Sequence, residues 1–142
     1  DAQHLSAKYL VRLRPTVNRK PLPAISLAQD TSTLTACGND YDFSDIFVRP
    51  FQALAKKNDI LIAITTSGNS KNVVKVLKEA RLKKITTLGL LGSNGGKCKN
   101  LCDIKLLVPN KSTARIQECH IFLGHFILEQ VENLLIKKKI IK

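Results

Sequence analysis

The chain has 142 residues, a length that suits one domain with a sizeable buried core. Hydrophobic residues make up 44% of it, yet no apolar run approaches the roughly 18 residues that span a bilayer, so we expect a soluble globular domain. The formal net charge of +12 raises the question of nucleic-acid binding, but aromatic residues are only 5% and no base-stacking motif is visible. A solvated basic surface, or one that attracts anionic metabolites, fits the composition better.

The four cysteines show neither CxxC spacing nor the density of a disulfide framework; they are Cys37, Cys98, Cys102 and Cys119. We interpret them as reduced thiols and, because no signal peptide opens the sequence, expect a cytoplasmic protein. The sequence contains no methionine, even at position 1, and opens on a helical pattern. We therefore expect the chain to be a fragment that lacks its natural N-terminus.

The first part of the chain predicts short helices and one strand. Apolar residues at helical spacing predict a helix over 1–13, which a basic, proline-punctuated loop follows. The apolar run at 24–28 has the length of a short strand. Further helices are predicted over 30–39 and over 43–55, the second kinked or restarted at Pro50.

The remainder of the chain alternates strands with helices. The continuous β-branched run at 59–65 is typical of a strand buried on both faces, and 85–92 and 103–109 predict two more strands. Helices are predicted over about 69–83 and 113–138. This alternation predicts an α/β fold, a three-layer sandwich whose parallel sheet is flanked by helices.

A cluster of hydroxyl residues lies between the strand at 59–65 and the helix after it. Gly68 permits a tight turn there, and the hydroxyls belong to Thr65, Thr66, Ser67 and Ser70. The free N–H groups of the following helix and its dipole favour an anion at the same place, at the carboxyl end of a strand. Helix capping alone would need only one such residue. The stretch therefore predicts a phosphate site, and its lack of a Walker lysine favours a sugar phosphate.

Four stretches carry a resemblance to a known family: GNDYDF at 38–43, TSGNSKNVVKVLKEA at 66–80, DIKLLVP at 103–109 and TARIQECHIFLGH at 113–125. In order and spacing they resemble the phosphoheptose isomerase group of sugar isomerase (SIS) domains. The resemblance covers essentially the whole chain. It implies one SIS domain over 1–142, flavodoxin-like in fold, whose N-terminal part precedes this chain, because the opening DAQH resembles the middle of a longer family motif.

The resemblance implies an activity. The family interconverts sedoheptulose 7-phosphate and D-glycero-D-manno-heptose 7-phosphate, an aldose–ketose isomerisation that supplies heptose for surface polysaccharide such as lipopolysaccharide or capsule. A base removes a proton beside the carbonyl to give an enediol, while an acid or a metal ion stabilises the oxyanion. Many members bind zinc.

Individual roles follow from the resemblance, position by position. Asn39, Asp40 and the four hydroxyl residues would contact the substrate. On the last predicted helix, His125 is the catalytic acid–base candidate and Gln117 is a catalytic and substrate-contacting residue. A zinc ion would be held by His4, Gln117 and His125.

One position departs from the family pattern. The family has a glutamate four residues after the histidine at position 4, where it serves as metal ligand and proton-transfer group, but here the residue is Lys8. His4 and Lys8 would share one face of a helix. A protonated lysine repels a cation, so Lys8 counts against zinc binding and against the family's usual acid–base pair.

The spacing of Gln117 and His125 bears on assembly. Eight residues separate them, roughly 12 Å along a helix and about 80° around it, so both reach one small ligand only where two subunits meet. The resemblance implies a homotetramer.

Two other functions stay open. One is a non-catalytic SIS-domain tetramer that binds the replication-initiator protein, which Lys8 favours, and the other is a sugar-phosphate-sensing module; His125 favours the enzyme.

Overall fold

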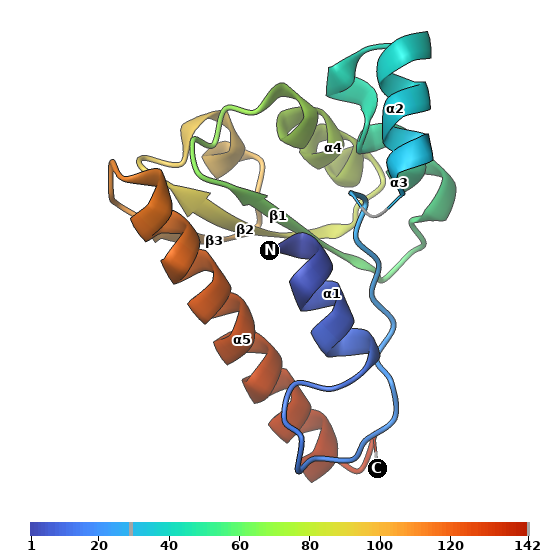
Figure 1. Ribbon diagram of the computed structural model, residues 1–142, viewed down its shortest axis with the longest axis vertical. Helices are drawn as coiled ribbons and strands as arrows, with labels where there is room; N and C mark the ends of the chain where they lie inside the picture. Colours follow the sequence, from blue (N-terminus) through green and yellow to red (C-terminus); the bar gives the residue numbers. More distant parts are fainter. Residues whose placement is uncertain (29, 142) are drawn as a thin grey trace.

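The structure is a computed structural model that describes residues 1–28 and 30–141. Its three strands form one parallel sheet in the order β1 (Ile60–Thr65), β2 (Thr86–Gly92) and β3 (Ile104–Val108), as Figure 1 shows. The register places Ile64 opposite Leu90 and Leu90 opposite Leu106. The predicted parallel α/β fold is confirmed.

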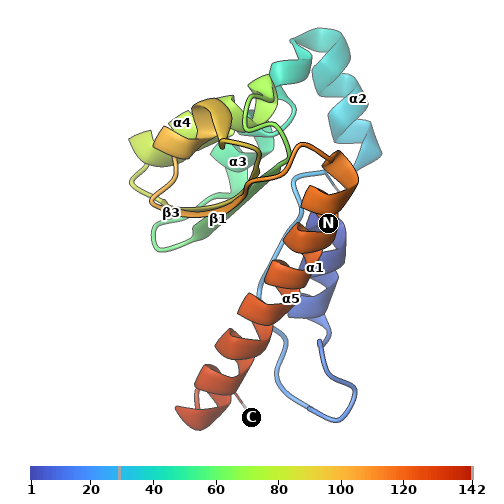
Figure 2. The ribbon, with the colours of Figure 1, turned by 90° about the vertical axis from the view of Figure 1, so that its left-hand side faces the viewer.

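Helices lie on both faces of this sheet. α4 (Lys71–Leu82) packs on β1 and β2, and α3 (Val48–Leu54) and α2 (Thr31–Asp40) lie on the same side. On the other side α5 (Thr113–Lys137) packs on β2 and β3, with α1 (Ala2–Leu10) beside it (Figures 1 and 2). Within the described residues, none of these helices combines the length and apolar character needed to cross a bilayer.

The main core lies between α4 and the sheet. Leu77 of α4 and Leu91 of β2 are fully buried, and they belong to a cluster that also contains Ala63, Val73, Cys98 and Cys102. Full burial of a leucine side chain contributes roughly 1.5–3 kcal/mol. This packing holds three consecutive segments as one unit: β1, the loop of hydroxyl residues at 65–70 (the hydroxyl loop) and α4.

The strand predicted at 24–28 is wrong. Residues 24–26 have no regular secondary structure and residues 27–28 form a turn, so the segment makes no ladder with any described strand. Its carbonyls instead accept side-chain hydrogen bonds from α1, from Ser6 Oγ to Ala24 O (3.2 Å) and from Gln3 Nε2 to Ala28 O (2.9 Å). The segment runs beside a helix, and these side chains satisfy backbone groups that a sheet would otherwise pair.

The helix predicted over 43–55 is divided. A short 3-10 helix, η1 (Phe43–Asp45), precedes α3, and the restart falls two residues before Pro50. Pro50 lies in the first turn of α3, where its missing N–H deprives the helix of no bond. Another short 3-10 helix, η2 (Gly96–Asn100), follows the turn after β2.

The burial predicted for the strand at 59–65 holds on one face only. Ile60 is 65% exposed and Ile62 is 37% exposed, whereas Ala63 packs in the core. β1 is an edge strand of the described sheet. Figures 1 and 2 show the reason: α5 extends away from the sheet and leaves one end of this face uncovered.

Candidate active site

Two histidines from opposite ends of the sequence meet where α1 lies against α5. His4 Nε2 is 2.8 Å from His125 Nε2, and the ring centroids are 5.0 Å apart. One of the two nitrogens must carry the hydrogen and the other must accept it. The close approach depends on Gly124, since a Cβ there would lie 2.7 Å from the side chain of Leu5 on α1. The structure thus brings together two residues predicted for the site.

The electrostatics of this pair favour a neutral His125. Burial lowers the pKa of His125, and positive charge at His4 and Lys8 lowers it further. A neutral imidazole offers a nitrogen that can accept a proton. The surroundings of His125 therefore suit a general base near neutral pH.

As a zinc site the pair is incomplete. Protein zinc sites use three or four ligands drawn from Cys, His, Asp and Glu. No group of three such residues able to hold a metal occurs in the part of the chain that the structure describes. Lys8, one turn after His4, adds a cation where a third ligand would be needed. The donors that this chain supplies at the pair do not by themselves fit zinc.

The hydroxyl loop forms the second part of the candidate site. Thr65 is buried, and its Oγ1 accepts the Gly68 N–H (3.2 Å) and contacts Ser70 Oγ (3.2 Å). Ser70 is the N-cap residue of α4 but makes no side-chain cap bond to a described residue. Ser67 is exposed and accepts the Asn69 N–H (3.1 Å). Thr65 therefore organises the loop, and the capping interpretation does not account for Ser70.

A second turn supports this loop from behind. Gly68 has φ +66°, and a Cβ on it would lie 2.0 Å from the carbonyl oxygen of Gly95. Cys98 N–H donates to Gly68 O (2.9 Å), and Lys97 N–H donates to Asn69 Oδ1 (3.1 Å). Only glycine tolerates both this conformation and this contact. The turn after β2 thus holds the hydroxyl loop in shape.

Lysines that the sequence analysis did not assign lie beside the loop. A pocket of about 200 Å³ is lined by Ser44, Asn69, Lys71, Val74, Lys75, Lys78 and Lys97. Positive charge at the N-terminus of α4 adds to the attraction that its dipole exerts on an anion. In the sequence, these lysines could have been suspected from Lys71, which directly follows the last hydroxyl residue.

The remaining predicted residues do not join the histidine pair within one chain. Asn39 Nδ2 donates to Asp40 Oδ1 (2.9 Å) at the end of α2, on the opposite side of the sheet from α1 and α5 (Figures 1 and 2). Gln117 is exposed near the start of α5 and forms no side-chain hydrogen bond with a described residue. Thr66, half-buried, lies in the hydroxyl loop.

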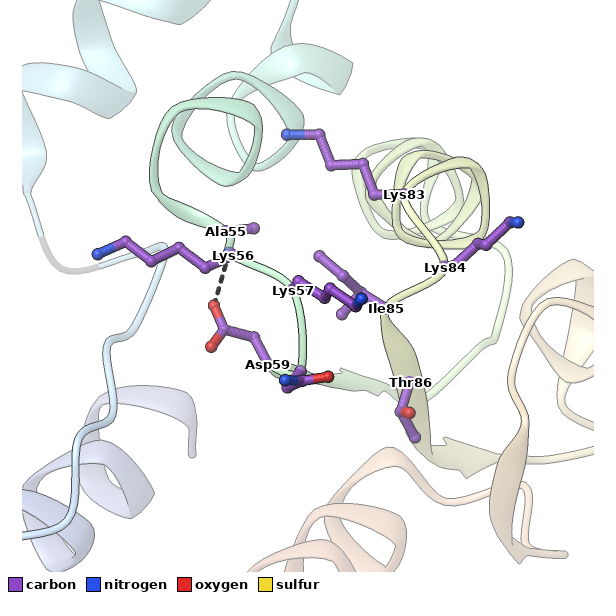
Figure 3. Close-up of a pocket in the computed structure, with 9 residues that line it drawn as sticks. Ala55, Lys56, Lys57, Asp59, Lys83, Lys84, Ile85 and Thr86 are labelled. Atoms are coloured by element: carbon purple, nitrogen blue, oxygen red, sulfur yellow. Dashed lines mark hydrogen bonds between the residues drawn. The ribbon is translucent and has the colours of Figure 1, made fainter.

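Another pocket lies away from this loop. It measures about 430 Å³ and is formed by the loops that precede β1 and β2. Figure 3 shows that the side chains of Lys56 and Lys84 extend to opposite sides of it, and Lys83 Nζ donates to Gln52 O (2.8 Å). Its cations therefore do not converge on a common point. Because ligands of parallel α/β sheets bind at the carboxyl ends of the strands, the hydroxyl loop is the better candidate.

Comparison with known proteins adds independent findings. A family model described as the SIS domain matches residues 1–92. The chain is 46% identical over 140 residues to the phosphoheptose isomerase of Clostridium acetobutylicum, covering 99% of this chain and 70% of the relative. It is 48% identical over 138 residues to the phosphoheptose isomerase of Aquifex aeolicus, covering 97% and 71%.

Solved structures agree with these relatives. The phosphoheptose isomerase of Neisseria gonorrhoeae superposes with a TM-score of 0.85 at 39% identity, covering 94% of this chain and 70% of that one. The enzyme of the same name from Francisella tularensis superposes with a TM-score of 0.83 at 40% identity, covering 90% and 68%.

Proposed function

We propose, because this chain belongs to the phosphoheptose isomerase family of SIS (sugar isomerase) domains, that it is an aldose–ketose isomerase that interconverts sedoheptulose 7-phosphate and D-glycero-D-manno-heptose 7-phosphate. The observation that carries the proposal is the pairing of His4 with His125, in a chain close to half identical to enzymes of that name. The same reaction would supply heptose for surface polysaccharide. The four cysteines are free, which suits a reducing, cytoplasmic setting.

The reaction moves one proton between two neighbouring carbons and a second proton between the oxygens that these carbons carry, so it needs a group that can accept and return a proton. Neutral His125 takes the proton from the carbon beside the carbonyl and returns it to the neighbouring carbon through the enediol. His4, hydrogen-bonded to His125, holds the ring in place and shares its proton. The positive charge of Lys8 beside the pair would stabilise the negative oxygen of the enediolate. No step of this proposal passes through a metal.

The phosphate end of the substrate is assigned to the hydroxyl loop. Ser67 and Ser70 are exposed there, the first turn of α4 offers N–H groups, and Lys71 and Lys97 add positive charge. Together these features suit a dianionic phosphate. Asn39, Asp40 and Gln117 are proposed to contact the sugar.

A homotetramer belongs to the same proposal. Asn39 and Gln117 lie apart from the histidine pair in one chain, so a complete site would combine residues of neighbouring subunits. Two aromatic side chains support an interface on α5, since Phe122 is 67% exposed and Phe126 is 51% exposed. Exposed aromatic residues one helical turn apart are typical of subunit contacts.

One observation favours a non-catalytic function as the alternative. Lys8 stands where the family has a glutamate, so the chain could be a tetrameric scaffold for the replication-initiator protein, or a sugar-phosphate sensor. Binding without turnover would distinguish either of these from the enzyme.

The test is turnover of sedoheptulose 7-phosphate, measured with added zinc and with chelator. We expect turnover that persists in the presence of a chelator. We also expect His125→Ala to abolish it. Turnover that depends wholly on zinc would reject the metal-free step but keep the isomerase. Binding of the sugar phosphate without any turnover would reject the isomerase in favour of a sensor or scaffold.

A further inference from the structure

α1 carries His4 but is too short to hold its own direction. It has nine residues, and isolated helices shorter than about 12–15 residues are marginal in water. Leu5 packs against Gly124 close to the histidine pair, and Gln3 and Ser6 donate side-chain hydrogen bonds to the segment at 24–28. These contacts lie in the first five residues of α1, so without a link at its other end the helix would be free to tilt and to rotate about its axis, which would change the distance between His4 and His125. A second attachment is therefore needed to keep the pair together.

Arg19 supplies an attachment at the other end of α1. Its side chain is fully buried. Its Nη2 donates to Lys8 O (2.9 Å), and its Nη1 donates to Tyr9 O (3.0 Å). These carbonyls belong to the last turn of α1, where carbonyl groups lack helical N–H partners. The guanidinium thus caps the helix, and its charge suits the negative end of the helix dipole.

The same guanidinium is bound to α5. Arg19 Nε donates to Glu132 Oε1 (2.6 Å), and the Glu132 side chain is also fully buried. Glu132 lies seven residues after His125, roughly 10.5 Å further along the helix. Two charges removed from water require each other, so neither side chain can leave without a large cost. One rigid side chain therefore links the end of α1 to a defined point on α5.

We propose that Arg19 is a positioning residue for the proposed active site: by joining the last turn of α1 to Glu132, it sets α1 against α5 and keeps His4 within hydrogen-bond distance of His125. The inference rests on the proposed role of that histidine pair. The planar fork is essential, because Arg19 reaches three backbone carbonyls as well as the carboxylate. A lysine keeps the charge but cannot reach them all.

Arg14 provides a matched control. Its Nε donates to Glu132 Oε2 (2.9 Å), and its Nη2 donates to Asn133 Oδ1 (2.6 Å). A further contact joins it to Glu129 at 3.5 Å. All three partners belong to α5. Loss of Arg14 therefore weakens the same carboxylate cluster without releasing α1.

The experiment compares Arg19→Lys with Arg14→Lys in the full chain. Turnover of sedoheptulose 7-phosphate gives kcat and KM. The imidazole ¹⁵N signals of His4 and His125, assigned with His4→Gln and His125→Gln, report the contact between the rings. We expect Arg19→Lys to lower kcat about 10- to 100-fold, because misplacement of a catalytic group by about 1 Å has that effect, with KM within about twofold. Both imidazole signals should shift, whereas Arg14→Lys should resemble the unmodified protein.

Two results would overturn the inference: unchanged imidazole signals in folded Arg19→Lys, or equal losses in both variants. If circular dichroism shows that Arg19→Lys does not fold, Glu132→Gln, which keeps the side-chain volume and one acceptor oxygen, is measured instead, and unchanged signals in it would have the same meaning. Absence of turnover in the unmodified protein would reject the proposed function alone, since the imidazole signals still test the positioning.

Discussion

Lys8 alters the candidate site through a single side chain. It lies one turn after His4 on α1, and its positive charge is one cause of the lowered pKa of His125. We expect Lys8→Glu to raise the affinity for zinc, because a carboxylate would then join two imidazoles. Competition with a chromophoric chelator measures this affinity in the full chain. Lys8→Gln is the control, since it removes the cation without adding a ligand. Equal zinc affinity in the two variants would contradict a latent metal site.

Ser67 tests the phosphate end of the site. Its hydroxyl is exposed and accepts only a local N–H bond from Asn69, so it is available to a ligand. A hydrogen bond to a charged group contributes about 1.5–3 kcal/mol, so Ser67→Ala should raise KM for sedoheptulose 7-phosphate about tenfold or more. Thr35→Ala, which removes an exposed hydroxyl on α2, should leave KM unchanged. An unchanged KM in Ser67→Ala would remove this residue from the phosphate site.

At the scale of elements, Gly124 determines how closely α1 approaches α5. A Cβ at this position would already lie 2.7 Å from Leu5. Gly124→Val should therefore separate the helices and lower the free energy of unfolding by about 1–3 kcal/mol, with loss of turnover. Gly38→Ala is the matched control, because a Cβ there meets no described atom within 4 Å and alanine favours the helix. Urea denaturation of both variants measures the difference, and similar stabilities would contradict close helix packing.

The contact between the basic loop and α5 makes stability depend on pH. Burial raises the pKa of Glu132, but hydrogen bonds from Arg19 and Arg14 outweigh this and lower it below the ordinary 4.5. The unfolded chain then binds a proton more readily than the folded protein does. The stabilisation by Glu132 is thus fully present above pH 4.5 and is lost as the pH falls through the lower folded pKa.

Glu132→Gln should accordingly reduce stability at neutral pH and flatten its fall in acid. Urea denaturation at a series of pH values measures both effects. Curves for the variant and the unmodified protein that run parallel through the acid range would show that this carboxylate does not contribute the pH dependence.

At the scale of the whole molecule, the proposed tetramer makes a prediction for α5. Phe122→Glu would place a charge in an apolar contact, so the variant should have a smaller mass in light scattering after size-exclusion chromatography. Leu82→Glu is the control, since Leu82 is 79% exposed at the end of α4, on the other side of the sheet. A tetramer that Phe122→Glu leaves intact would place the interface elsewhere, and a monomeric unmodified protein would reject the tetramer.

Much of the fold follows from local pattern. The helix after the hydroxyl loop and the three strands of the sheet were predicted within a few residues, because their apolar periodicity depends only on neighbours in the chain. The strand predicted at 24–28 failed since apolar residues of strand length can equally pack beside a helix. The predicted burial of the second face of β1 was wrong for a related reason. The direction of α5 decides what that face contacts, and no local sequence pattern indicates that direction.

The sequence by itself determined the alternation of strands and helices, the hydroxyl-rich turn at the end of β1, and the residue types able to carry the chemistry. Only the tertiary structure decided which of them meet. His4 and His125 are 121 positions apart, and their contact depends on a glycine under α1 and on a buried arginine at its end. Such contacts between distant segments depend on how helices pack and where buried charges find partners, and these are properties of the folded chain rather than of any local stretch.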